Sequence, residues 1–203
     1  MAGRFLILLI AWLGISDGAC HAVEATRTDK KGTVIVVQDQ QATRAFTPQP
    51  LTLGNMISEG MRMLTGKPSA KEAWLSVINT NDVVGLKVYT TSGGGAGTRP
   101  AVVAQVIESL LEAGISQGKI VIWDRREADL RAAGYLDLAA KYKVRVLGSQ
   151  EAGYDADAHY STPLLGNLVF GDLDFGKKGP GIGRNSYVTK LLTHEITKVI
   201  NIT

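Results

Sequence analysis

The clearest pattern in the chain lies between residues 82 and 125, where two short apolar runs flank a stripe of apolar residues at helical spacing. The runs, residues 83–88 and 119–123, are almost unbroken, which is typical of strands in a parallel sheet covered on both faces. The stripe contains Val102, Val103, Val106, Ile107, Leu110 and Leu111. It predicts an amphipathic helix, and Gly114 supplies the expected helix end.

The same alternation continues toward the C-terminus. Residues 128–142 predict one or two helices that break near Gly134, and residues 144–147 predict another strand. The order strand, helix, strand, helix, strand favours a parallel sheet with right-handed crossovers. The sequence therefore predicts an α/β fold with a mostly parallel sheet and helices on both faces.

Further elements are predicted before this unit. Residues 33–37 are rich in β-branched side chains and predict a short strand, and residues 51–64 predict a helix. The apolar stripe of that helix, which we expect to pack in the core, contains Leu53, Ile57, Met61 and Leu64. Ser69 is the expected N-cap of another helix, with Glu72 at capping-box spacing. Its predicted buried face contains Trp74, Leu75 and Ile78.

The segment from residue 148 to 184 is rich in glycine and poor in helix signals. Residues 167–175 alternate in a way that predicts a β-hairpin, and an internal segment of this length is either functional or a small subdomain. After it, a helix is predicted from Asn185 or Ser186 through His194, followed by a last strand at residues 199–202. We expect the domain to be incomplete at its C-terminal end, because no closing helix follows that strand.

The first 25 residues have the pattern of a secretory signal peptide. Arg4 precedes the apolar residues 5–15, which are too few to span a bilayer comfortably, and small residues follow. An uncleaved N-terminal anchor is the alternative. We therefore expect an exported protein, periplasmic or extracellular, with one α/β domain at residues 26–203 and no membrane span after cleavage.

Composition excludes several classes of partner and cofactor. The formal net charge is +3 and no run of basic residues exceeds two, which argues against nucleic acid but permits an anionic ligand. The single cysteine, Cys20, lies in the predicted signal peptide, so the mature chain has no thiolate for a disulfide, zinc site or iron–sulfur cluster. His159 and His194 lie far apart in sequence, so we predict no metal site.

The loop SGGGAGT at residues 92–98 is the first candidate for binding chemistry. It lacks the Gly-Lys-Ser/Thr ending of a P-loop and the third glycine of the dinucleotide fingerprint. Its glycines let backbone N–H groups approach a ligand, and a helix N-terminus follows, with Thr98 as its expected cap and Pro100 in its first turn. The loop either binds an anion or is an ordinary flexible loop with a capped helix.

Charged residues lie at or just past the predicted strand ends, where open α/β sheets bind ligands. Lys87 stands within an apolar run, and Asp124 ends the neighbouring predicted strand as its natural partner. The pair is either a structural ion pair or part of a ligand site. The predicted ligand-binding residues are Lys87, Thr98, Arg99, Asp124, Arg125 and Arg184. No nucleophile, base and orienting group occur in a recognisable set, so no catalytic residue or cofactor is assigned.

Several ordered blocks of the chain resemble the domain of unknown function 362 family. The blocks include VVGLKV, KIVIWDR, LRAAGY and GDLDFGKKGPGIGRNSYVTKLLTHEITKVINIT. The resemblance covers roughly residues 75–203 and implies an α/β fold in a bacterial protein. Some relatives carry ferredoxin-type cluster modules, but this chain has no cysteines to match them. Members usually continue past the equivalent of Asn201 into a His/Asn/Gly-rich block, and no established reaction comes with the family name.

Three functions follow as hypotheses. The first is an exported protein of unknown activity that binds a small anionic molecule at the carboxyl ends of the strands, either as a binding protein or as part of an enzyme site. The second is a non-catalytic interaction or scaffold protein. The third is a redox-associated protein that acts with an iron–sulfur partner. Neither a substrate nor an oligomeric state can be assigned from the sequence.

Overall fold

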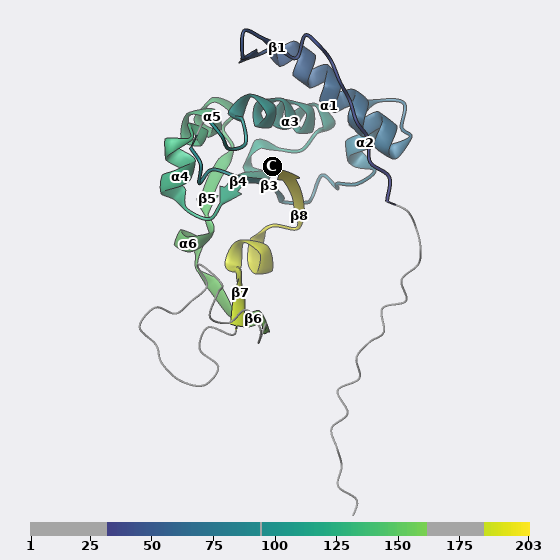
Figure 1. Cartoon of the computed structure of the whole chain (residues 1–203). Helices are drawn as coiled ribbons and strands as arrows, with labels where there is room; N and C mark the ends of the chain where they lie inside the picture. The colour runs from purple at the N-terminus through teal and green to yellow at the C-terminus, as the bar shows by residue number, and fades with distance from the viewer. Residues whose placement is uncertain (1–31, 94, 162–184) are drawn as a thin grey trace, which may run out of the picture. The chain divides into compact units, whose positions relative to one another are not determined.

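A computed structural model describes residues 32–93, 95–161 and 185–203, and its centre is a parallel sheet (Figure 1). The four strands lie in the order β5-β4-β3-β8, and all three neighbouring pairs are parallel. Their bounds are β3 Val84–Val88, β4 Ile120–Asp124, β5 Arg145–Gly148 and β8 Lys198–Ile202. The predicted α/β class and the predicted strands of this sheet are confirmed.

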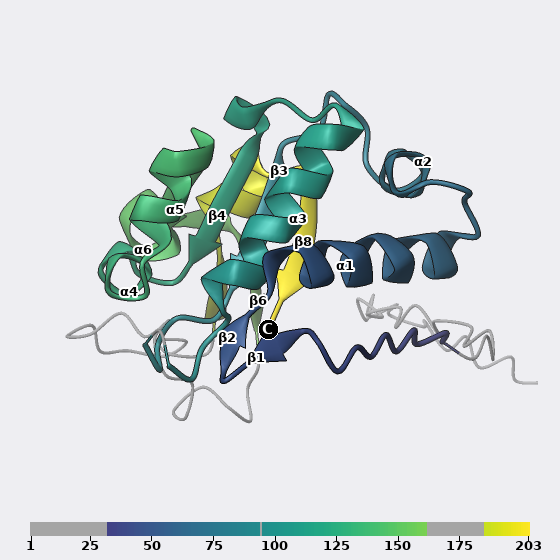
Figure 2. The same ribbon diagram turned by 90° about the horizontal axis from the view of Figure 1, so that it is seen from above.

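One face of the sheet is covered by the helices that join its first three strands. Helix α3, Pro100–Ala113, and the short 3₁₀ turn η1, Gln117–Lys119, join β3 to β4. Helices α4, Glu127–Ala132, and α5, Tyr135–Tyr142, join β4 to β5. Figure 2 looks down on this layer, with α3 lying over the strands. The main core forms here, because one side of β3 and β4 meets the apolar stripe of α3. Its fully buried members include Val84, Leu86, Val88, Val103, Ile107, Leu110, Ile120 and Ile122.

The opposite face carries the connection from β5 to β8. This connection contains α6, Ser149–Ala152, then β6, Tyr154–Ser161, which pairs antiparallel with β7, Asn185–Thr189. A π-helical turn, η2 Leu191–Glu195, then leads into β8. Leu191 and Ile196 pack against Val121 and Trp123 in a second, smaller core. The predicted hairpin at residues 167–175 lies outside the described residues.

Gly85 has no side chain, which lets the residues of the second core pack closely against β3. A β-carbon at this position would lie 2.7 Å from Ile196 Cδ1 and 2.8 Å from Trp123 Nε1. Real β-carbons do not approach other atoms so closely, so any larger residue here would push Ile196 and Trp123 outward. The glycine thus fixes where the indole of Trp123 sits, beside the strand position that Lys87 occupies.

The order of the strands defines a switch in the direction of winding. From β3 the chain moves outward to β4 and β5 along one face, and then returns by the other face to place β8 on the far side of β3. In doubly wound sheets, ligands bind in the crevice beyond the carboxyl ends of the two strands where the winding reverses. Here those strands are β3 and β8.

The N-terminal elements form an outer layer beside α3. Helix α1, Pro50–Thr65, and helix α2, Ala70–Leu75, both pack against it, and Trp74 Nε1 donates a 2.8 Å hydrogen bond to Ser109 Oγ. A small hairpin, β1 Thr43–Arg44 and β2 Thr47–Pro48, precedes them. The capping of α2 by Ser69 is confirmed, since its hydroxyl accepts from Glu72 N. Leu75 is 39% exposed and Leu64 is 53% exposed, so the predicted burial of both was wrong.

Three local predictions were wrong, each because a tertiary contact decided the conformation. Residues 33–37 form no strand, since they lie against α1 and no strand among the described residues pairs with them. Residues 185–189 form β7 because they pair with β6, and only the π-helical turn follows where a full helix was predicted. The residue at the N-cap of α3 is Arg99, not Thr98, whose hydroxyl is engaged elsewhere. By contrast, Gly114 ends α3 and Gly134 separates α4 from α5, both with positive φ, as predicted.

Within the described ranges, no helix is both long enough and apolar enough to cross a membrane. The predicted signal peptide and its cysteine fall before residue 32, outside the described part of the chain.

Candidate functional site

The candidate site begins with an ion pair at the carboxyl ends of β3 and β4. Lys87 Nζ lies 2.8 Å from Asp124 Oδ1, as the sequence predicted for this pair. The two strands are adjacent and parallel, so both residues lie at the same edge of the sheet. Asp124 is only 5% exposed, whereas the side chain of Lys87 is 29% exposed. The pair therefore has a buried anionic half and a cationic half that reaches solvent.

Asp124 is saturated with hydrogen-bond donors. Its Oδ2 accepts from Thr90 N at 2.8 Å and from Thr90 Oγ1 at 2.6 Å, while Lys87 holds Oδ1. Burial alone would raise the pKa of Asp124. The hydrogen bonds from Lys87, Thr90 and the backbone of Arg125, with the charge of Lys87, outweigh burial and hold that pKa below its ordinary value. The carboxylate stays ionised, and its role is to fix Lys87 and the chain after β3.

Lys87 retains binding capacity after these contacts. Its ammonium donates to Asp124 Oδ1 and, at 2.5 Å, to the backbone oxygen of Val88. A lysine ammonium has three donors, so one remains for a further acceptor. The indole of Trp123 lies alongside, with Nζ 5.7 Å from the ring centroid. These contacts orient the charge and leave part of it open to solvent.

The loop after β3 is closed at its base by Thr98. Thr98 N donates to Tyr89 O at 2.8 Å, Tyr89 N donates to Thr98 Oγ1 at 2.9 Å, and Thr98 Oγ1 donates to Ile202 O at 2.6 Å. Tyr135 OH donates to Thr98 O at 2.6 Å from the start of α5. Burial and the nearby charge of Asp124 raise the pKa of Tyr135, so it remains a neutral donor. Thr98 thus joins the ends of β3 and β8 to α3.

The glycines of this loop permit close approaches and hydrogen bonds within the backbone of the loop itself. A β-carbon on Gly97 would lie 2.3 Å from Tyr89 O, an approach that only glycine permits. Gly93 has a φ of +72° and donates to Thr90 O, and Gly97 N donates to Gly93 O. Those two N–H groups are therefore used within the loop and are not free to bind a ligand.

Three predicted site residues remain to be placed, namely Arg99, Arg125 and Arg184. Arg99 is exposed and Arg125 is half-buried, and within the described ranges neither side chain has a hydrogen bond or ion pair. Both follow the strand ends, so they add positive charge to the edge that carries Lys87. Arg184 lies outside the described residues. The sequence did not single out Thr90 or Tyr135; the only signal for Thr90 was its polar side chain just past a buried strand.

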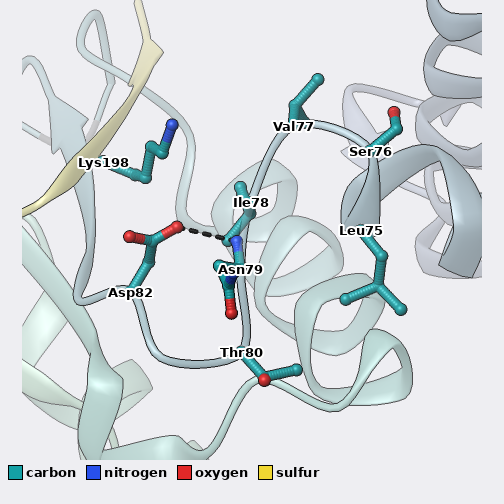
Figure 3. A pocket seen from close by; sticks show the side chains of 8 residues that line it. All are labelled: Leu75, Ser76, Val77, Ile78, Asn79, Thr80, Asp82 and Lys198. Carbon is teal, nitrogen blue, oxygen red and sulfur yellow. Dashed lines mark hydrogen bonds between the residues drawn. The ribbon is translucent and has the colours of Figure 1, made fainter.

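A separate groove lies at the opposite edge of the sheet (Figure 3). It has a volume of about 540 Å³ and is lined by Leu75, Ser76, Val77, Ile78, Asn79, Thr80, Asp82 and Lys198. The carboxylate of Asp82 in this groove is already hydrogen-bonded, since it accepts from Asn79 N at 2.7 Å and from Thr197 Oγ1 at 2.8 Å. Lys198 is exposed at the start of β8. In doubly wound sheets ligands bind at the carboxyl ends of the strands, so this groove lies at the wrong edge.

No group of three or more metal-ligating side chains occurs among the residues that the structure describes. Comparison of the chain with family models finds no match, and neither the curated proteins nor the solved structures compared with it give one. The resemblance to the domain of unknown function 362 family therefore stays a prediction from the sequence blocks, and the function must be argued from the site.

Proposed function

We propose that this chain is an exported α/β protein that binds a small anionic ligand at the carboxyl ends of β3 and β8. The observation that carries the proposal is the state of Lys87. Its ammonium is fixed by Asp124 and Val88, keeps one free donor and is open to solvent at the switch point of the sheet. A positive group fixed in advance binds an anion with little loss of side-chain freedom.

The electrostatics of the edge support an anion in preference to a cation. The carboxylate beside Lys87, that of Asp124, is buried and already accepts hydrogen bonds from Lys87 and Thr90. Arg99 and Arg125 add two further positive charges along the same edge. The same saturation of Asp124 removes it as a general base, so the proposal is binding and assigns no reaction.

A thermal-shift measurement tests the proposal. Phosphate or succinate at ten times its Kd stabilises the parent protein by about 1.4 kcal/mol, which raises its Tm by roughly 3 to 5 °C. Sodium chloride at equal ionic strength is expected to give a smaller shift, because it screens charge without occupying a site. Lys87→Met is expected to abolish the anion-specific shift relative to its own baseline.

Lys198→Met is the matched control, because it removes an exposed lysine at the other edge of the same sheet. It should keep the full shift. If Lys198→Met loses the shift and Lys87→Met keeps it, the anion binds in the groove of Figure 3 and the proposal is wrong. If no anion stabilises the parent protein, a scaffold or interaction role becomes the better account.

Export rests on the N-terminal pattern of Arg4 and the apolar residues 5–15. Mass spectrometry of the chain recovered from the periplasm or the medium is expected to find an N-terminus near residues 22–25. An intact Met1 on protein recovered only from the cytoplasm would contradict export.

A further inference from the structure

Lys87 belongs to a row of residues, in register on neighbouring strands, that crosses the sheet. The strand register places Lys87 beside Trp123 of β4 on one side and beside Asn201 of β8 on the other. Partners in register on parallel strands lie about 4.8 Å apart and point to the same face. Val84, Leu86 and Val88 fill the main core, so the alternation along β3 puts Lys87 on the opposite face. Asn201 therefore flanks Lys87 on the side away from the indole.

The layer that covers this face of the sheet extends over β4 but not over β8. On β4, Val121 is fully buried and Trp123 is 7% exposed, because the second core lies over them. On β8, Val199 is 49% exposed and Asn201 is exposed. The boundary between the covered and the open part of the face passes along β3, where Lys87 is half-buried. The side of Lys87 that faces Asn201 is therefore the open side of this face.

The carboxamide of Asn201 is available to such a ligand. Its strand is held by backbone pairing with β3, and among the described residues its side chain has no hydrogen-bond partner. Asparagine is depleted within strands, so a packing preference does not account for it. The carboxamide offers both an acceptor and donors, whereas the ammonium of Lys87 only donates. Together they match an anionic group next to a hydroxyl, which can donate to the carboxamide oxygen and accept from its N–H.

We propose that Asn201 determines the specificity of the site, and that the ligand class is a small hydroxycarboxylate with its carboxylate on Lys87 and its hydroxyl on Asn201. This inference rests on the anion-binding function proposed above. Inorganic phosphate and a simple dicarboxylate can both bind Lys87 through their negative charge. A simple dicarboxylate, however, lacks the hydroxyl that the carboxamide of Asn201 recognises. The expected preference corresponds to one hydrogen bond, about five- to tenfold in Kd.

Calorimetric titration with malate and succinate tests the inference, because the two dicarboxylates differ by one hydroxyl. The parent protein is expected to bind malate about five- to tenfold more tightly. Asn201→Leu, which keeps the size of the side chain and removes its polar atoms, should bind both with the affinity of the parent for succinate. Lys198→Met, on the same strand, should keep the preference.

The outcomes separate this inference from the function on which it rests. If Lys87→Met loses both ligands while Asn201→Leu still prefers malate, the anion site stands and the role of Asn201 is wrong. A parent protein that binds malate and succinate equally would also contradict the role of Asn201 and leave the anion site standing. If Lys87→Met binds like the parent protein, or the parent binds neither ligand, both the site and the inference are overturned.

Discussion

Replacement of Asp124 by alanine is expected to lower the free energy of unfolding by about 3 kcal/mol, as measured by chemical denaturation at neutral pH. The change removes the acceptor of Lys87 Nζ and of both donors of Thr90, one of which is a backbone N–H in a buried residue. Buried donors that lose their acceptor cost more than the hydrogen bond contributed. The expected loss lies at the low end for a buried pair, because Lys87 can still reach water.

The effect of Asp124 is expected to depend on pH with a defined sign. The pKa of Asp124 is lowered in the folded state, so the unfolded chain binds its proton more readily. Its contribution is therefore fully present above the unfolded value near 3.8 and is lost as the pH falls through the lower folded value. The stability difference between the parent and Asp124→Asn should shrink over that acidic window.

Glu59→Ala is the control for this pair. Glu59 forms an exposed ion pair with Arg62 at 2.7 Å, and such pairs contribute at most about 0.5 kcal/mol. If Asp124→Ala costs no more than Glu59→Ala, the network at the ends of β3 and β4 does not stabilise the fold as described.

Replacement of Val106 by aspartate is expected to cost about 4 kcal/mol of unfolding free energy, enough to unfold a marginally stable domain. Val106 is 6% exposed and lies on the face of α3 that packs on the sheet. An aspartate there would bury a charge with no partner. Circular dichroism during thermal unfolding would show the loss.

Ala101→Asp places the same side chain in the first turn of the same helix. That position is only half-buried, and a negative charge at a helix N-terminus is favourable, so the variant should stay within about 0.5 kcal/mol of the parent. Equal stability of Val106→Asp and Ala101→Asp would contradict the placement of α3 over the sheet.

Much of the candidate site was predictable, because it depends on residues that end adjacent strands. One apolar run contains an isolated lysine, and the next run ends in an aspartate. Once the two runs form neighbouring parallel strands, these two side chains are expected to pair. The partners of Asp124 and Thr98 were not predictable in this way. Thr90 bends back onto Asp124, and Tyr135 reaches Thr98 from another helix. Such contacts depend on how loops and helices close, and no spacing in the sequence encodes that.

By itself, the sequence determined the elements whose burial pattern repeats locally. The apolar runs of β3 and β4, the stripe of α3 and the glycines that end α3 and separate α4 from α5 each carry their own signal, since their conformation is set by neighbours in the chain. Only the tertiary structure decided that residues 33–37 form no strand, that residues 185–189 form β7, and that Asn201 lies beside Lys87. A strand exists only where another strand pairs with it, and that partner can be more than a hundred residues away in the chain, as β8 is from β3.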